Sequence, residues 1–262
     1  MKKANASTSK KSASKSAVSA KPGKATSSGA STIEDLVAAN RILYAQSVLD
    51  GYGHVSARHD KKPNLFWMSR GMAPGLVTAD DIMVFDLSGE PVDARGRAVY
   101  AERFIHSEIY RRRSDVKAIV HSHSPAVIPF GVTNVPLKPI FHMGGFLGTG
   151  VPTFEIREVA GDTDMLVRNP GLGAALALCL GAKSAALMRG HGSVAVGASL
   201  PQVVFRAIYL EVNARLQSEA MRLGTINFLT PEEAKLASAG NDAHVLRPWA
   251  LWKREITKGN ST

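Results

Sequence analysis

Two histidines, His121 and His123, stand one residue apart at the end of the apolar run Val116–Val120. Side chains at positions i and i+2 of an extended strand point to the same face, so both imidazole rings can converge on one point beyond the strand. Two ring nitrogens aimed at one point suit a divalent metal ion. The same pair is also compatible with two hydrogen-bonded or solvated rings at a strand end, so the surrounding sequence must decide.

A third histidine, His191, follows the apolar segment 185–188 in a glycine-rich turn. With the His-x-His pair it completes the three nitrogen ligands that are typical of a catalytic metal site with one position left open for water or substrate. Glu102 lies outside this ligand set and is available as a general acid or base. The sequence therefore predicts one divalent metal ion per subunit, and the ligands accept Zn²⁺, Mn²⁺ or Co²⁺ without selecting among them.

Several helices and strands must position these residues, and hydrophobic periodicity predicts where they lie. Helices and strands are interspersed, and several strands follow one another through short turns, which favours an α/β fold with a mixed sheet and helices on its faces. Helices are expected over residues 31–49, 101–113, 164–180 (interrupted around Pro170) and 200–223, and strands over 52–58, 65–68, 81–86, 116–121, 151–156, 185–188 and 193–196.

The chain has 262 residues, of which 45% are hydrophobic and 21% charged, as in an ordinary soluble globular protein. Residues 1–30 contain seven lysines and no acidic residue, which leaves only +3 of the formal net charge of +10 for the remainder. We expect residues 1–30 to form a disordered Lys/Ser/Ala-rich tail, and residues 31–262 to form a single domain. This tail has no aromatic residue, so specific nucleic-acid binding is not expected.

No apolar run approaches the ~20 residues that are needed to cross a bilayer. We therefore expect a soluble, cytoplasmic protein without a membrane partner.

The order of the motifs resembles the class II aldolase and adducin family. Glu102-x-x-x-His106 precedes a strand that ends in His121-x-His123, and His191-Gly192 precedes a long helix. The stretch 53–58 parallels the Gly-Asn-x-Ser-x-Arg motif of the family. The resemblance covers about residues 33–222 and implies a three-layer α/β/α subunit with a central mixed, largely antiparallel sheet. It also implies a homo-oligomer, often a tetramer with active sites at subunit interfaces, a metal on the three histidines, and Glu102 as the acid/base residue.

The positions that hold the substrate phosphate in the sugar-phosphate aldolases of this family differ in this sequence. Those enzymes have small polar residues there, whereas this sequence has His54, Arg70 in Ser69-Arg70-Gly71, Tyr100 and Ala101. Arg70 supplies a planar, two-pronged donor suited to a carboxylate. His54 and Tyr100 are too bulky for the original phosphate pocket. Each of these residues could instead be an ordinary packed or surface residue.

The catalytic tyrosine of those aldolases is matched here by His142, which can exchange protons near neutral pH. The segments 68–70, 102–106 and 121–125 are more similar to the decarboxylase branch of the family. Its members act on hydroxy-carboxylates from aromatic breakdown, namely carboxylated hydroxymuconic semialdehydes, dihydroxyphthalates and a hydroxypyridine dicarboxylate.

The resemblance thus implies a metal-dependent decarboxylase of a small-molecule hydroxy-carboxylate from aromatic catabolism. The metal would stabilise an enolate, and Glu102 or His142 would deliver the proton. The substrate-binding residues would be His54, Ser69, Arg70 and Tyr100. One alternative is a class II aldolase that cleaves a hydroxy-acid or a sugar phosphate. Another is a non-catalytic, adducin-like interaction module, which the presence of all three histidines and Glu102 disfavours.

Overall fold

The computed structural model describes Met1 and residues 28–258, so the tail expected over residues 1–30 lies almost entirely outside the described residues. Within the described part of the chain, no helix is both long enough and apolar enough to span a membrane.

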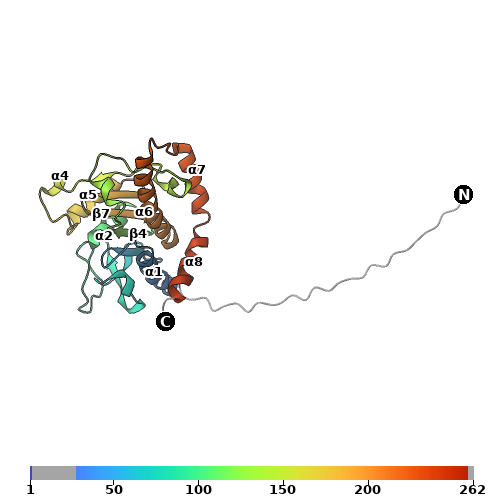
Figure 1. Ribbon diagram of the computed structural model, residues 1–262. Coiled ribbons are helices and arrows are strands. Elements are labelled where there is room, and N and C mark those ends of the chain that lie inside the picture. Colours follow the sequence, from blue (N-terminus) through green and yellow to red (C-terminus); the bar gives the residue numbers. More distant parts are fainter. Residues whose placement is uncertain (2–27, 259–262) are drawn as a thin grey trace.

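The molecule has a seven-stranded mixed sheet in the order β3-β2-β1-β4-β7-β6-β5. Its neighbouring strands β4 and β7 lie in the middle of the molecule (Figure 1). All neighbouring strands are antiparallel except β5 and β6, which are parallel. The strands are β1 His54–Arg58, β2 Leu65–Ser69, β3 Ile82–Asp86, β4 Ala118–Ser122, β5 Thr153–Phe154, β6 Ala185–Met188 and β7 Gly192–Gly197. The expected mixed, largely antiparallel sheet is confirmed.

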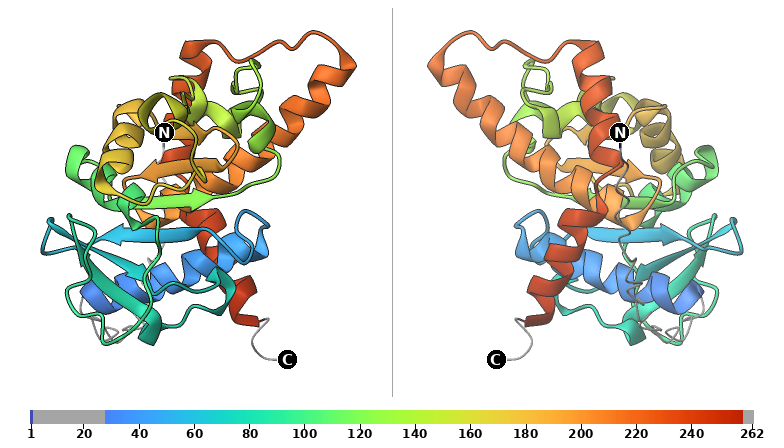
Figure 2. Two further views of the ribbon diagram at one scale, coloured as in Figure 1. Left: turned by 90° about the vertical axis from the view of Figure 1, so that its left-hand side faces the viewer. Right: turned by 90° about the vertical axis from the view of Figure 1, so that its right-hand side faces the viewer.

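Helices cover both faces of this sheet, which confirms the expected three-layer α/β/α architecture. Helices α1 (Ser28–Ala45), α6 (Leu200–Leu223) and α8 (Leu246–Lys258) lie on one side, and α2 (Arg103–Arg112) and α5 (Pro170–Leu180) on the other (Figure 1). Figure 2 shows the C-terminal part of α6 and its connection to α7 extending beyond the sheet. The remaining helices are α3 Ile128–Gly131, α4 Arg157–Ala160, α7 Pro231–Asp242, and the 3-10 helices η1 Pro74–Leu76, η2 Ala79–Asp81 and η3 His142–Leu147.

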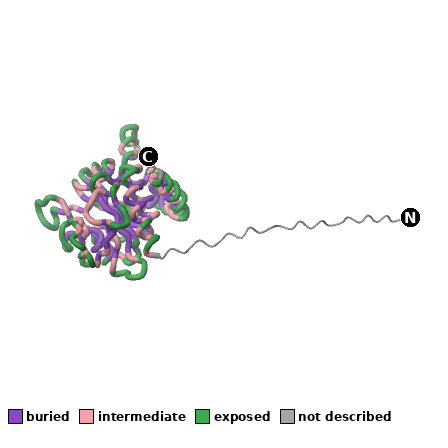
Figure 3. The backbone as a smooth tube through the Cα atoms, turned by 90° about the horizontal axis from the view of Figure 1, so that it is seen from below, coloured by how far each residue is buried: buried purple, intermediate pink, exposed green. Residues whose placement is uncertain are grey.

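The central strand β4 separates two hydrophobic cores because its side chains alternate between the faces of the sheet. Ala118 and Val120 pack with residues of α1 and α6, whereas Ile119 packs with residues of α2 and α5. Figure 3 shows that the buried residues are concentrated in the middle of the molecule and that the exposed ones form its rim. By the same alternation, His121 lies on the face of Ile119, toward α2.

Helices α1 and α5 differ most from the bounds that the sequence predicted, and α2 is shorter than expected by two residues at its start and one at its end. Helix α1 begins three residues before the expected Ser31 and ends four residues before Leu49, because Ser47 adopts a left-handed backbone (φ 57°). Helix α5 begins at Pro170 instead of being interrupted there, and the Asn169 side chain caps it. Proline is favoured in the first turn of a helix and asparagine at the N-cap, so this pair marks a helix start. The residues before Asn169 are therefore a loop, which borders the site described next.

Candidate metal centre and active site

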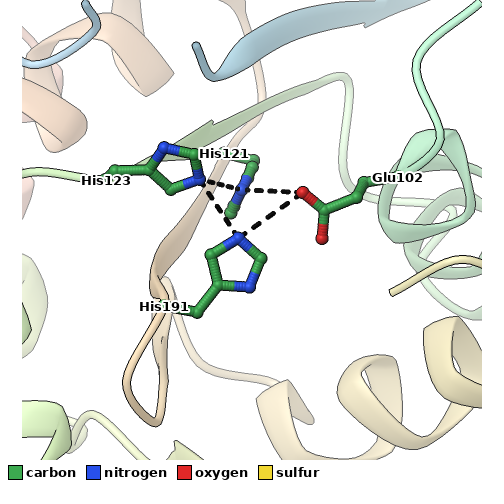
Figure 4. Close-up of side chains that lie close together, drawn as sticks. All are labelled: Glu102, His121, His123 and His191. Atoms are coloured by element: carbon green, nitrogen blue, oxygen red, sulfur yellow. Dashed lines mark hydrogen bonds and ion pairs between the residues drawn. The ribbon is translucent and has the colours of Figure 1, made fainter. Parts of the chain in front are cut away.

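Three histidine rings converge at one edge of the sheet, where β4 pairs with β7 (Figure 4). His121 lies in β4, His123 follows that strand directly, and His191 lies in the turn between β6 and β7. His123 Nε2 is 3.2 Å from His121 Nε2 and 3.1 Å from His191 Nε2. Strand pairing thus brings together three ring nitrogens from parts of the chain about 70 residues apart.

Glu102 faces the same point from the opposite side (Figure 4). It directly precedes α2, and its Oε2 is 3.5 Å from His121 Nε2 and 3.4 Å from His191 Nε2. The other carboxylate oxygen, Oε1, accepts a hydrogen bond of 2.9 Å from the backbone N–H of Val167. One atom from each of Glu102 and the three histidines lies within 4.8 Å of the others, as in a group that can hold a metal ion.

The hydrogen bonds behind the rings determine which nitrogens can bind a metal. His121 Nδ1 is 3.1 Å from the backbone oxygen of Ser193, and His191 Nδ1 is 2.9 Å from that of Met165. A carbonyl oxygen only accepts, so both Nδ1 atoms carry the proton and both Nε2 atoms present a lone pair. The three ring nitrogens and the carboxylate oxygen, which face one another at 3.1–3.5 Å, form a set of donor atoms suited to a cation. These separations are close to the ~3.4 Å expected between ligands at the corners of a tetrahedral zinc site, so the residues fit a divalent metal.

The charges in this cluster favour ionised glutamate and basic ligands. Burial raises the pKa of Glu102, but the close approach of His121 and His191 outweighs this effect and holds the pKa well below its usual range. Burial lowers the pKa of His191, but Glu102 raises it more, so the net shift is upward. Burial, together with the other two histidines, lowers the pKa of His123 to about 4. Glu102 is therefore ionised.

A chain of buried, hydrogen-bonded polar side chains lies beside the group formed by Glu102 and the three histidines. His54 Nδ1 is 2.6 Å from His106 Nε2, and His106 Nδ1 is 2.6 Å from Ser56 Oγ. Ser56 Oγ is in turn 2.8 Å from the hydroxyl of Tyr110. Burial lowers the pKa of His106 to about 3 and lowers that of His54 well below its usual value, so both rings are neutral near pH 7.

A cavity of about 730 Å³ opens in front of the cluster. Glu102, His123 and His191 line its floor, and His54 and Tyr100, whose ring centroids are 4.7 Å apart, form one wall. Among the residues that the structure describes, no lysine or arginine lines this cavity.

The remaining residues that the sequence singled out lie in other surroundings. Ser69 is buried, with its Oγ 3.2 Å from the Tyr100 hydroxyl, which also donates to the backbone oxygen of Met72 at 2.5 Å. Arg70 is outside the cavity lining, and its Nε donates to Asp81 Oδ1 at 2.7 Å.

His142 also lies outside the lining of this cavity. It begins η3, its side chain is exposed, and its backbone oxygen accepts a hydrogen bond of 2.8 Å from Asn241 Nδ2 in α7. Within one subunit, the structure therefore brings Glu102 and the three histidines together and leaves His142 away from them.

The loop before α5 is a part of the site that the sequence did not predict. Asp164, Met165 and Leu166 line the cavity, Met165 holds His191 through its carbonyl, and Val167 holds Glu102 through its N–H. Met165 has a left-handed backbone (φ 65°), which is unfavourable for a residue with a side chain. Such backbone strain is typical of functional sites, and here the carbonyl of Met165 orients the ring of His191. The Asn-Pro pair at the start of α5 was the available signal that this segment is a loop.

Comparisons with known proteins agree with this fold. The family model of the class II aldolase and adducin N-terminal domain matches residues 34–218. The chain is 39% identical to decarboxylase tropJ of Talaromyces stipitatus over 87% of this chain and 94% of that protein. It is 29% identical to 3,4-dihydroxyphthalate decarboxylase of Arthrobacter keyseri over 82% and 90% of the respective chains. The structure of L-fuculose 1-phosphate aldolase from Glaciozyma antarctica PI12 superposes with a TM-score of 0.76 at 24% identity, covering 92% of this chain and 95% of that one.

Proposed function

Because this chain belongs to the class II aldolase and adducin family and is a lyase, we propose that it is a divalent-metal-dependent decarboxylase of a hydroxy-carboxylate. The substrate would be an acid from aromatic catabolism, of the dihydroxyphthalate or carboxy-hydroxymuconic semialdehyde type. The similarity to relatives named as decarboxylases along most of the chain supports this reaction.

The composition of the cavity is the observation that carries the choice of substrate. A phosphate group is usually held by cationic side chains or by several N–H donors. Here the wall presents the rings of His54 and Tyr100, and no described lysine or arginine lines the cavity. The aromatic wall of His54 and Tyr100 supports a planar acid held at the candidate metal site rather than a phosphorylated sugar.

Glu102 is the residue proposed to move the proton. A divalent ion at the three histidines, Zn²⁺ or Mn²⁺ with Co²⁺ as a further candidate, would supply Lewis-acid stabilisation of the negative charge that develops as carbon dioxide leaves. The N–H of Val167 occupies Oε1 of Glu102, so Oε2, the oxygen that faces His121 and His191, would accept the proton of the substrate hydroxyl. Glu102 then returns this proton to the carbon that has lost the carboxylate and kept the electron pair of the broken bond. The released product regains its hydroxyl proton from water.

Arg70 and Ser69 would act at the margin of the cavity. The guanidinium of Arg70 donates a hydrogen bond to Asp81 through Nε, and its two terminal nitrogens form no hydrogen bond with any of the described residues. We propose that these nitrogens bind a second carboxylate of the substrate, one that is not lost. Ser69 would position Tyr100 through their hydroxyl contact.

His142 would act in a neighbouring subunit of a homotetramer. Its exposed side chain on η3 lies away from the cavity of its own chain, which supports a role across a subunit interface. Mixing an inactive His142→Phe variant with an inactive Glu102→Gln variant should restore activity if subunits exchange, because some cavities would then contain both native residues. Mixed tetramers without regained activity would contradict this role.

The test of the proposed function is an assay of carbon dioxide release from a panel of dihydroxyphthalates and carboxylated muconic semialdehydes. The protein should turn over at least one of these acids, lose activity after exhaustive chelation, and regain it with Mn²⁺, Zn²⁺ or Co²⁺. Activity that survives chelation would contradict the metal dependence. Release of an aldehyde from a hydroxy-acid or a sugar phosphate, without carbon dioxide, would favour an aldolase. A protein that binds no metal and turns over neither class would favour an adducin-like interaction module.

A further inference from the structure

The buried chain Tyr110–Ser56–His106 ends on His54, and it determines which hydrogen-bonding group His54 offers to the cavity. All four side chains are buried, so each of their polar hydrogens needs an acceptor. His54 Nδ1 is hydrogen-bonded to His106, whereas His54 Nε2 has no hydrogen-bond partner among the described residues. Nε2 is also not among the fully buried polar atoms that lack a partner. Because His54 lines the cavity, Nε2 is the atom that a bound molecule can reach.

The direction of the chain follows from counting protons. The Tyr110 hydroxyl has Ser56 Oγ as its hydrogen-bond partner within the described residues, so Tyr110 donates and Ser56 accepts. Ser56 can then place its own hydrogen on His106 Nδ1, and a neutral His106 places its single N–H, at Nε2, toward His54 Nδ1. The opposite direction would leave the buried hydroxyl proton of Tyr110 without an acceptor, at a cost of about 1–3 kcal/mol. The first arrangement is therefore favoured.

We propose that Tyr110, Ser56 and His106 are positioning residues that hold His54 in the tautomer with its proton on Nε2. In this tautomer His54 presents a neutral N–H donor to the carboxylate that leaves as carbon dioxide. His54 Nδ1 must stay unprotonated in this arrangement, because it receives the N–H of His106 at 2.6 Å. The ring is thereby kept neutral by its hydrogen-bond partner. The identity of the acceptor rests on the proposed function, whereas the tautomer does not.

A neutral donor is suited to this reaction because the carboxylate loses its charge as the carbon–carbon bond breaks. A cation beside the leaving carboxylate would stabilise the bound acid more than the transition state and would slow its departure. A neutral N–H can orient the carboxylate with a smaller penalty of this kind. The structure separates the two types of group, since His54 lines the cavity and Arg70, the candidate partner of a retained carboxylate, lies outside the lining.

A double-mutant cycle in the metal-loaded enzyme tests this relationship. His54→Phe and His106→Phe should each lower kcat/KM for carbon dioxide release from a dihydroxyphthalate by about tenfold to a hundredfold, with unchanged metal content. The double variant should be no slower than His54→Phe alone, because His106 acts only through His54. His106→Gln, which keeps an N–H donor toward His54, should retain most of the activity. His59→Phe is the matched control, since this histidine directly follows β1 and lies outside the cavity.

Two results in the cycle would overturn the proposal. One is a full additional loss from His106→Phe in the His54→Phe background, which would mean that His106 has a separate structural role. The other is a normal kcat/KM for His54→Phe, which would mean that His54 does not contact the substrate.

Nitrogen-15 NMR of the histidine rings tests the tautomer without any substrate. The metal-loaded wild-type protein should show His54 protonated at Nε2 and unprotonated at Nδ1, and His106→Phe should populate both tautomers. A wild-type His54 with its proton on Nδ1 would refute the inferred direction of the chain. If no acid of the panel is turned over but this tautomer is found, the proposed function fails while the assignment of the tautomer stands.

Discussion

Replacing Glu102 with glutamine removes one negative charge and the ability to carry a proton while it keeps the size of the side chain. The amide oxygen can still accept the 2.9 Å hydrogen bond from Val167, so the local backbone should not change. Loss of a general acid/base typically costs about 10²–10⁴ in rate, or ~3–5 kcal/mol of activation free energy. We expect kcat for carbon dioxide release to fall by this factor.

The metal should remain bound in this variant at saturating concentration, because the three histidines are unchanged. Its affinity should be weaker, since the glutamine places no negative charge 3.4–3.5 Å from the ring nitrogens of His121 and His191. Metal content by elemental analysis, measured on the same samples as kcat, separates the loss of proton transfer from the loss of the metal.

Glu108→Gln is the matched control for Glu102→Gln. Glu108 is also buried, lies on α2, and pairs with Arg111 at 3.4 Å, but it does not line the cavity. Its replacement should change kcat less than about twofold. A metal-loaded Glu102→Gln protein with a kcat within tenfold of wild type would refute the assignment of the proton transfer to Glu102.

Three further predictions follow from the geometry around the site. Gly192→Ala should lower the free energy of unfolding by about 1–3 kcal/mol and displace His191, because a Cβ there would overlap a backbone oxygen at the end of β4. The control Gly240→Ala adds a Cβ in α7 where no atom is near, so it should raise the free energy of unfolding by about 0.5–1 kcal/mol. Urea denaturation measures both values, and equal effects would contradict the clash. Arg70→Lys should lower kcat/KM for a dicarboxylate at least tenfold with metal content unchanged, and a normal value would make Arg70 a bystander. Burial lowers the pKa of His191, but Glu102 raises it more, so a proton competes with the metal for Nε2 of His191. Calorimetry should therefore show metal affinity falling as the pH drops below neutral. An affinity that stays constant down to about pH 4, where His123 titrates, would argue against His191 as a metal ligand.

The sequence alone determined the elements of the sheet, the fold class and the types of residue at the candidate metal centre. Strand alternation is local, so the apolar run before His121 was enough to predict that His121 and His123 share one face. Helical spacing likewise predicted α2 and α6 with small errors at their ends. Proton-carrying side chains next to such elements are visible in the sequence, which is why Glu102 and His191 could be named beforehand.

Only the tertiary structure decided which of these side chains meet. One hydrogen-bonded chain joins His54 and Ser56 of β1 to His106 and Tyr110 of α2. The bonded residues are 50 to 54 positions apart in the sequence, and no local pattern encodes that pairing. The same holds for the loop at Met165, whose backbone orients a ligand without any distinctive side chain.

Three residues that were expected in the pocket, Ser69, Arg70 and His142, lie outside its lining. The positions of Arg70 and His142 have a related explanation. Arg70 follows β2, and packing of the segment before β3 provides Asp81 as its partner. His142 belongs to η3, which packs against α7, a helix about 90 residues later in the chain. Hydrophobic periodicity indicates which face of a helix or strand is buried. The residues that contact this face belong to distant elements, and their packing depends on the whole core.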